Sequence, residues 1–203
     1  MRKVSLLFAI PVLGLLAAFR GANTPVHVTG QEIHNFRLPN TSGGFTSLAD
    51  YRDARGFIIV FTCNHCPFAK LYTARLNALS HIFGRLRVPL LAINPMDTTL
   101  YGEESMASMR ERAHAAGFDF PYLQDAAQVV GKDFHAAHTP AAYVIWKEGE
   151  KWTIRYSGAI DDNGQHPEQA TPFVANAVSE LLSGKAVTQP ETVSLGCAIN
   201  YRK

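Results

Sequence analysis

The chain has 203 residues, of which 47% are hydrophobic and 10% aromatic, and a formal net charge of +2. This length can bury the core of one domain, and the aromatic content argues against disorder over most of it. Charged residues make up only 18% and form no Lys/Arg cluster, which argues against a nucleic-acid-binding protein.

Residues 1–25 form a segment separate from that domain. Arg2 and Lys3 precede an uncharged apolar run over 4–19, the pattern of a secretory signal peptide. The run is slightly short for a membrane span, which needs roughly 17–25 residues, and the cleavage site is weak, since Ala18 and Ala22 fit the small-x-small pattern poorly. Cleaved export and uncleaved anchoring through 4–19 both stay open. We expect the protein to be exported, either periplasmic or anchored on the outer face of the cytoplasmic membrane.

A short hairpin is expected at the start of the domain. Residues 34–39 and 45–46 carry strand residues on either side of a turn cluster at 40–44. Ser47 can then cap a helical turn over 48–51.

A buried strand followed by a helix comes next. Residues 56–62 are an apolar run with β-branched side chains, typical of a strand that is buried on both faces. Apolar residues then recur at helical spacing from Phe68 to Phe83. Pro67 suits the first turn of that helix, where its missing N–H costs nothing.

The rest of the chain alternates between strands and helices. We expect a buried strand at 88–93, helices at 105–116 and at 126–134 (capped by Asp125), a strand at 141–146 that pairs with 152–157, and a helix at 168–182. A parallel pair with right-handed crossovers, followed by this hairpin, predicts an α/β protein. Its mixed central sheet is flanked by helices on both faces.

Cys63 and Cys66 stand two residues apart, where the buried strand passes into the helix. Free N–H groups at a helix start favour a thiolate, which is the form that attacks disulfides. Such a pair can cycle between dithiol and disulfide through a mixed disulfide. We expect Cys63 to ionise more easily and attack, and Cys66 to resolve the mixed disulfide. His65 lies between them, where a protonated imidazole would stabilise a thiolate; the alternative is a solvated histidine with little effect.

The third cysteine, Cys197, has no partner nearby in sequence. A structural pair or half a zinc site at Cys63 and Cys66 is the alternative interpretation, but zinc needs a second pair of ligands. We therefore expect neither a metal nor a cofactor. Cys197 is either a buried small hydrophobe or an additional thiol that pairs with Cys63 or Cys66.

Several segments resemble the thioredoxin-fold redoxins, both the peroxiredoxin-like (AhpC/TSA-like) and the membrane-anchored thioredoxin-like proteins. The matching segments are 35–43 and 46–51 for the N-terminal hairpin, 61–67 for the active-site turn, and 138–140 for the cis-proline loop. Residues 158–163 and 196–199 resemble a narrower peroxiredoxin-like subgroup.

The resemblance implies a thioredoxin-like fold over 26–188, with an N-terminal β-hairpin extension, followed by a tail at 189–203. It also implies a cis bond between Thr139 and Pro140, beside a groove in which the Thr139 backbone holds a substrate chain.

Two departures from the family pattern bear on function. Peroxidases of the related peroxiredoxins carry Thr three residues before the reactive cysteine, where this chain has Val60. Thioredoxins carry a buried acid six residues before the first cysteine, where this chain has Phe57. Peroxide reduction is therefore disfavoured, and the sequence names no substitute for the acid.

These observations predict an enzyme, a thiol-disulfide oxidoreductase that uses Cys63 and Cys66. Its partners would be a protein or small-molecule disulfide or thiol and an electron donor or acceptor, without nucleic acid. One alternative is a peroxiredoxin-like thiol peroxidase. Another is a non-enzymatic copper binder that uses both cysteines and a histidine, since thiolates and imidazole suit Cu(I).

Overall fold

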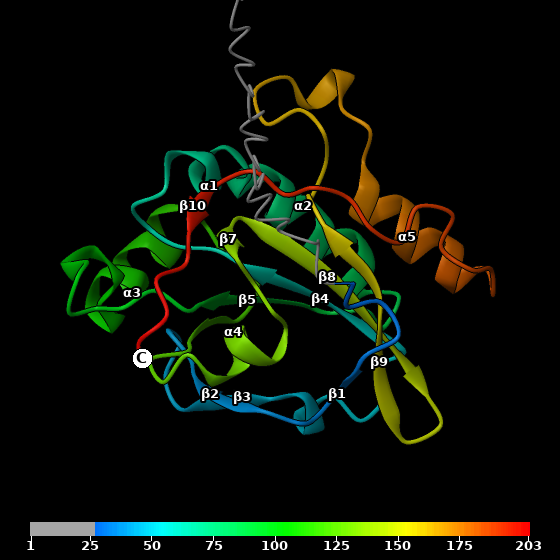
Figure 1. Ribbon diagram of the computed structural model, residues 1–203, viewed down its shortest axis with the longest axis horizontal. Helices are drawn as coiled ribbons and strands as arrows, with labels where there is room; N and C mark the ends of the chain where they lie inside the picture. The colour runs from blue at the N-terminus through cyan, green and yellow to red at the C-terminus, as the bar shows by residue number, and fades with distance from the viewer. Residues whose placement is uncertain (1–26) are drawn as a thin grey trace, which may run out of the picture.

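The computed structural model describes residues 27–203, so the expected signal or anchor at 1–25 lies outside the described residues. The centre of the fold is a six-stranded sheet in the order β1-β9-β8-β4-β5-β6 (Figure 1). Its strands are β1 (Glu32–Ile33), β4 (Gly56–Phe61), β5 (Leu90–Asn94), β6 (Tyr122–Gln124), β8 (Ala141–Glu148) and β9 (Lys151–Gly158). Within 27–203, no helix combines the length and apolar character that crossing a membrane requires.

Strand β4 lies in the middle of this sheet, and every one of its residues is buried. It pairs in parallel with β5 and antiparallel with β8, and β5 pairs in parallel with β6. The sheet is therefore mixed, as the sequence predicts. An unbroken apolar run suits this place because helices and loops cover both faces of the sheet.

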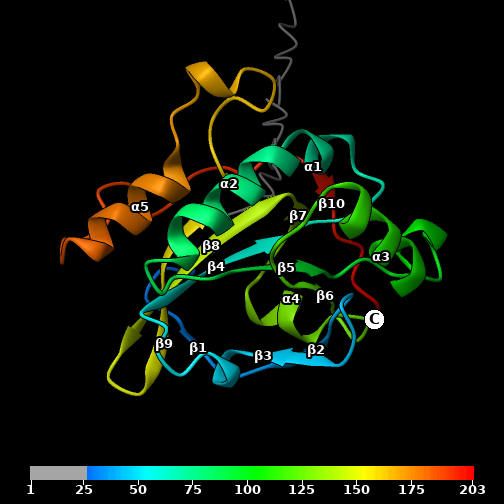
Figure 2. The same cartoon turned by 180° about the vertical axis from the view of Figure 1, so that it is seen from behind.

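Helices cover the sheet on both faces (Figure 2). Helices α2 (Thr73–Gly84), α3 (Met106–Ala115) and α5 (Phe173–Leu182) contribute to one apolar core, which includes Ile58 and Val60 of β4. The short helix α4 (Val129–Asp133) contributes to the core on the opposite face. The fold is thioredoxin-like, as expected.

The N-terminal hairpin is also confirmed. Strands β2 (Arg37–Pro39) and β3 (Phe45–Ser47) pair antiparallel. Ser47 then caps a 3-10 turn, η1 (Leu48–Asp50), through a capping box with Asp50. Leu48 buries its side chain in the same core as α4.

Several boundaries differ from the sequence prediction. The helix after the cysteines is divided into α1 (Pro67–Leu71) and α2, and the last helix is preceded by a separate 3-10 turn, η3 (Pro167–Gln169). Helix α4 begins later than expected because Gln128 takes a left-handed conformation, with φ of 58°. Asp125 still caps the helix by accepting the backbone N–H bonds of Val129 and Gly131.

The expected irregular tail contains a strand. Strand β10 (Cys197–Ala198) pairs antiparallel with β7 (His138–Thr139), and the two form a separate two-stranded sheet. The sequence gives no signal for either strand, because a two-residue strand exists only through its partner. This pairing returns the tail to the end of β4 where the cysteines lie.

Candidate functional site

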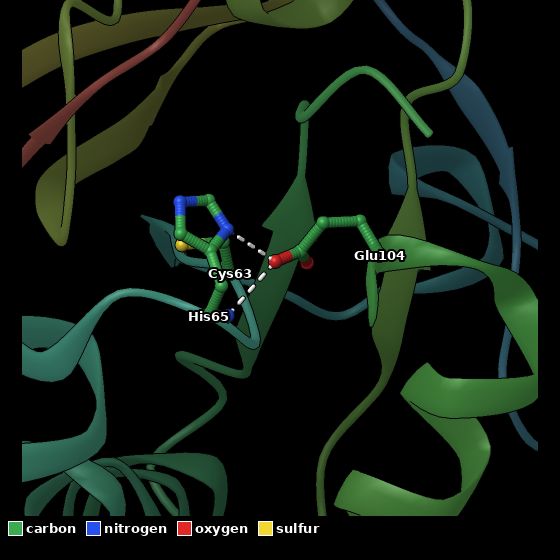
Figure 3. Close-up of side chains that lie close together, drawn as sticks. All are labelled: Cys63, His65 and Glu104. Carbon is green, nitrogen blue, oxygen red and sulfur yellow. Dashed lines mark hydrogen bonds and ion pairs between the residues drawn. The ribbon is translucent and has the colours of Figure 1, made fainter. Parts of the chain in front are cut away.

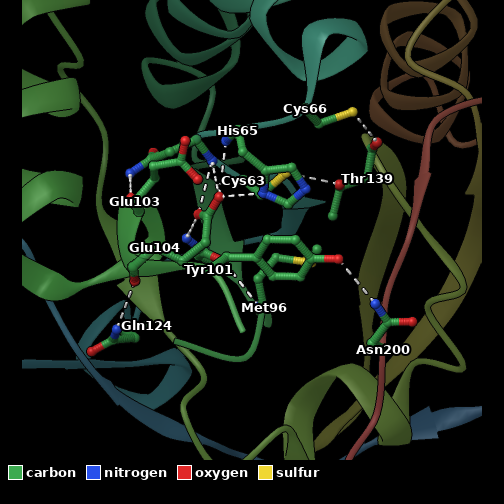
Figure 4. Close-up of polar contacts among 12 residues, drawn as sticks. Cys63, His65, Cys66, Met96, Tyr101, Glu103, Glu104, Gln124, Thr139 and Asn200 are labelled. Carbon is green, nitrogen blue, oxygen red and sulfur yellow. Dashed lines mark hydrogen bonds and ion pairs between the residues drawn. The ribbon is translucent and has the colours of Figure 1, made fainter. Parts of the chain in front are cut away.

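The two cysteines lie where β4 passes into α1, and Cys66 is the residue that precedes the first turn of the helix. Both are buried: Cys63 is 3% exposed and Cys66 is 0% exposed. The Sγ of Cys63 lies 3.0 Å from the hydroxyl oxygen of Thr139, and the Cys66 thiol donates to the Thr139 carbonyl oxygen over 3.2 Å (Figure 4). A single residue of a distant loop therefore contacts both sulfurs.

Thr139 is held in place by the loop that the family resemblance pointed to. The Thr139–Pro140 peptide bond is cis, as expected. Thr139 itself is fully buried, and Pro140 borders an open hollow of about 690 Å³. The structure thus brings together four of the predicted site residues: Cys63, Cys66, Thr139 and Pro140.

Glu104 is a buried carboxylate that the sequence analysis did not identify. It accepts the backbone N–H of Asn64 at 3.1 and 2.9 Å and that of His65 at 2.8 Å. The Nδ1 atom of His65 lies 2.6 Å from the same carboxylate (Figure 3). A charge from a segment about 40 residues away therefore fixes the turn between the cysteines.

A polar network supports Glu104 from the ends of two strands. Asn94, the last residue of β5, donates from Nδ2 to the Glu104 carboxylate over 2.6 Å. Gln124, the last residue of β6, donates to the Glu104 backbone carbonyl over 3.0 Å, and the hydroxyl of Tyr122 donates to Asn64 Oδ1 over 2.9 Å. One sequence signal pointed here: Asn94 is a polar residue that ends an otherwise apolar buried strand.

The acidity of Cys63 is opposite to what the sequence analysis expected. Burial raises the pKa of Cys63 to about 12. Within that net shift, the hydrogen bond from Thr139 lowers the pKa of Cys63, and the negative charge of Glu104 raises it. The position after a buried strand therefore disfavours the thiolate at Cys63.

Cys66 is the more acidic thiol of the pair. Burial raises its pKa, but hydrogen bonds from the Cys197 thiol and from the backbone N–H groups of Ala69 and Phe68 outweigh burial, so the pKa of Cys66 is lowered. The expected effect of the helix start is thus present, but it acts on the second cysteine.

His65 faces Glu104 and Tyr101. Its ring stacks on the Tyr101 ring with centroids 4.3 Å apart and an angle of 10° between the planes. Its Nδ1 contacts the Glu104 carboxylate, and a ring nitrogen of His65 also lies within 4.8 Å of the Cys63 sulfur. The predicted tuning role of His65 stays a prediction.

Cys197 reaches Thr139 from the tail. It is partly exposed, and it is the register partner of Thr139 in the pairing of β10 with β7. Burial and the neighbouring Cys66 thiol raise the pKa of Cys197 to about 11. All three cysteines are free thiols that meet around one loop residue.

Cys63, His65 and Glu104 also form a group of potential metal ligands in the described part of the chain. One ligand atom from each lies within 4.8 Å of the others. The carboxylate, however, already accepts N–H bonds from Asn64, His65 and Asn94. A metal ion would have to displace these bonds, so the geometry favours a carboxylate that holds the turn.

The family model described as the AhpC/TSA family matches residues 29–164, and the chain belongs to this family. No curated protein matches the chain.

Two solved structures are similar over nearly the whole domain. One is a hypothetical protein, SMc02350, from Sinorhizobium meliloti 1021, with a TM-score of 0.79, 29% identity, and coverage of 87% of this chain and 96% of that one. The other is an uncharacterized conserved protein from Geobacillus kaustophilus, with a TM-score of 0.76, 32% identity, and coverage of 86% and 92%.

Peroxidoxin BcpB from Mycobacterium tuberculosis shares the fold at 17% identity, with a TM-score of 0.56 and coverage of 77% of this chain and 96% of that one. The chain is thus a thioredoxin-fold redoxin, and membership of this family is consistent with oxidoreductase activity.

Proposed function

We propose that the protein is a thiol-disulfide oxidoreductase in which Cys63 and Cys66 form the redox pair. The observation that carries this proposal is the contact of both sulfurs with Thr139, one at its hydroxyl and one at its carbonyl oxygen. Two thiols that share one contact residue are close to each other. The turn between them is rigid, because Glu104 accepts the N–H groups of its two middle residues.

In the oxidised chain, a substrate thiolate attacks the Cys63 sulfur and breaks its bond to Cys66, which leaves as a thiolate. A second substrate thiolate then attacks the substrate sulfur of the mixed disulfide. The substrate departs as a disulfide, and Cys63 takes up a proton. Two electrons have passed from the substrate to the pair, and the reverse sequence would reduce a substrate disulfide.

The difference in acidity suits this order of events. A leaving thiol with a lower pKa leaves faster, and the pKa of Cys66 is lowered. Attack on Cys63 therefore releases the better leaving group. Because a stabilised Cys66 thiolate also favours the reduced form, we propose that the pair acts as an oxidant.

A thiol peroxidase is the second candidate, and Thr139 is the observation in its favour. Its hydroxyl lies 3.0 Å from the Cys63 sulfur, so it could supply the hydrogen bond that Val60 cannot. Against this candidate, attack on a peroxide requires a thiolate, and the pKa of Cys63 is raised to about 12. The copper-binder alternative needs both cysteines and a histidine, but the Nδ1 atom of His65 contacts the Glu104 carboxylate and the Cys66 thiol donates to Thr139, so it is the weaker one.

The proposal includes export, since Arg2, Lys3 and the apolar run at 4–19 have the pattern of a signal or anchor. In an oxidising compartment, a dithiol pair of this kind would find disulfides and thiols as substrates. Fractionation of cells that express the tagged full-length protein tests this. We expect the protein in the periplasm or on the outer face of the cytoplasmic membrane, and a cytoplasmic location would contradict the proposal.

The activity test gives the oxidised full-length chain a reduced dithiol peptide and, separately, hydrogen peroxide with a thiol. We expect the peptide to be oxidised in proportion to the enzyme, and Cys63→Ser and Cys66→Ser to reduce the rate to background. Gly84→Ala is the control, because a methyl group at this exposed position meets nothing within 4 Å. Peroxide turnover that survives Cys66→Ser, without peptide oxidation, would overturn the proposal in favour of a peroxidase.

A further inference from the structure

The chain's own tail pairs with the edge of strand β7. Cys197 pairs with Thr139 and Ala198 pairs with His138 in antiparallel register. The N–H of Ile199 also donates to the carbonyl oxygen of Ala137 over 2.9 Å. An unpaired strand edge can receive a strand from another chain, but here that place beside the cis-proline is filled from within.

Gly196 allows this close approach. A Cβ atom at this position would collide with the carbonyl oxygen of Thr139 and would also crowd the nitrogen of Pro140. A glycine is therefore required where the tail crosses the loop. Substitution at Gly196 offers a way to move the tail away from the loop without removing a thiol.

The residues that follow Cys197 in the tail are hydrogen-bonded to the domain, whereas Leu195, two residues before it, is exposed. Downstream, Gln128 donates to the Asn200 carbonyl over 2.9 Å, and Arg202 donates to Asp97 over 2.7 Å. Upstream, Leu195 is 73% exposed. Cys197 therefore lies where the tail passes from solvent to the buried site.

The three sulfurs differ in their access to solvent. Cys66 is 0% exposed and Cys63 is 3% exposed, whereas Cys197 is partly exposed. Thr139 connects the three cysteines: the Cys66 thiol donates to its carbonyl oxygen, the Cys63 sulfur lies 3.0 Å from its hydroxyl oxygen, and Cys197 is its register partner. Cys63 and Cys66 also belong to one apolar cluster, and Cys197 packs against it, so Cys66 has a second cysteine on each of the two segments that contact Thr139.

We propose that Cys197 is a third redox thiol, which exchanges with the Cys63–Cys66 disulfide at the Cys66 sulfur and presents the resulting disulfide to external thiols at the surface. This inference rests on the function proposed above and deepens it. The tail would then serve as a built-in substrate strand whose cysteine connects the buried pair with the solvent.

The exchange balances without an external oxidant. The Cys197 thiolate attacks the Cys66 sulfur, the bond between Cys63 and Cys66 breaks, and a bond between Cys66 and Cys197 forms. Cys63 leaves as a thiolate and takes the proton that Cys197 gave up. An external thiolate then attacks the Cys197 sulfur, which releases Cys66 and leaves a mixed disulfide on Cys197.

The test uses full-length chains oxidised in a glutathione buffer, alkylated and analysed by peptide mass spectrometry. In Cys63→Ser we expect an intramolecular Cys66–Cys197 disulfide, and in Cys197→Ser a Cys63–Cys66 disulfide. If Cys63→Ser yields only free or glutathione-bound thiols while Cys197→Ser forms its disulfide, the relay is wrong and the proposed function stands. If Cys197→Ser forms none, the proposed function fails and the relay fails with it.

The Gly196→Ala variant keeps all three thiols and provides a second test. Displacement of β10 should reduce the fraction of Cys66–Cys197 disulfide several-fold relative to the otherwise unchanged chain, while the Cys63–Cys66 disulfide still forms. Gly84→Ala should leave both fractions unchanged. An unchanged Cys66–Cys197 fraction in a folded Gly196→Ala chain would overturn the proposed role of β10.

Discussion

The surroundings of Cys63 and Cys66 differ although the two residues belong to one turn. Cys63 is buried close to the negative charge of Glu104, and its pKa is raised to about 12. Cys66 is buried as well, yet the N–H groups of α1 and the Cys197 thiol lower its pKa. Both thiols lose hydration, so the groups that contact each sulfur decide which of them ionises.

The deciding contacts come from distant parts of the chain. Glu104 belongs to the 3-10 turn η2 (Gly102–Glu104), and Cys197 belongs to the tail. A short motif with two cysteines therefore fixes where the sulfurs are, while the rest of the fold fixes what each sulfur does. Four predictions, taken from the largest expected effect to the smallest, test this dependence on distant contacts.

The largest effect is expected when the two cysteines are replaced one at a time. When Cys66→Ser is given a peptide disulfide, a mixed disulfide between Cys63 and the peptide should accumulate and turnover should fall to background, because the Cys66 thiol that would attack Cys63 and release the peptide is absent. In Cys63→Ser no lasting adduct should form on Cys66, which is fully buried. Mass spectrometry of the trapped peptides shows which cysteine carries the adduct in each variant. A stable adduct on Cys66 would show that Cys66, and not Cys63, forms the mixed disulfide.

Replacement of Glu104 should have the next largest effect, on stability. Glu104→Gln places an amide against N–H donors that need an acceptor, and we expect a loss of about 3 kcal/mol in the free energy of unfolding. Removal of the charge should also lower the pKa of Cys63, because Glu104 raises it.

The adjacent Glu103→Gln is the matched control for this substitution, since the Glu103 side chain is exposed. Denaturant unfolding gives the stability. Thiolate absorbance measured against pH, in chains where Cys66 and Cys197 are serine, gives the pKa. Equal stability of the two glutamine variants would show that Glu104 does not hold the turn.

A smaller effect is expected from the tail thiol on the acidity of Cys66. Cys197→Ala removes a hydrogen-bond donor, so the pKa of Cys66 should rise and the fraction of thiolate at neutral pH should fall. Cys197→Ser keeps a hydroxyl donor and should have less effect. Thiolate absorbance against pH, in chains that also carry Cys63→Ser, measures the pKa of Cys66 in both variants. An unchanged titration in Cys197→Ala would show that Cys197 does not lower the pKa of Cys66.

The smallest effect concerns the ion pair that holds the end of the tail. Hydrogen bonds from Arg202 and Thr99 lower the pKa of Asp97 from 3.8 to about 2. The folded-state pKa is depressed, so the stabilisation is complete above the ordinary value and is lost as the pH falls from about 4 to about 2.

Hydrogen exchange of the Ile199 amide, which bonds to Ala137, reports on this attachment. Asp97→Asn should make the exchange faster, as should acid in the unsubstituted chain, whereas Asp119→Asn at an exposed position should have no effect. Identical exchange in Asp97→Asn and the unsubstituted chain would show that the ion pair does not hold the tail.

The parts of the fold that were predictable from the sequence have local signals. The apolar run of β4, the helical spacing after Pro67 and the capping residue Ser47 each occupy a short stretch of chain. Strands β7 and β10 have no such signal, since each has two residues and forms only by pairing with the other. The division between α1 and α2 was missed because the apolar spacing continues through Tyr72.

For the site, the sequence identified the sulfurs and the cis-proline loop but not the groups that control them. Glu104 is indistinguishable in sequence from other acidic residues that precede a helix start. Its burial follows from the meeting of η2 with the ends of β5 and β6. The expected order of acidity was wrong for the same reason, because helix geometry alone said nothing about Glu104 or Cys197.

The most direct test is a titration of the full-length chain in glutathione buffers, with mass spectrometry of the trapped disulfides. We expect a two-electron transition that joins Cys63 and Cys66. Its midpoint should lie above about −270 mV, toward the value of about −120 mV of a strong oxidant, because the Cys66 thiolate is stabilised. Complete oxidation in which Cys63 and Cys66 never pair would contradict their assignment as the redox pair.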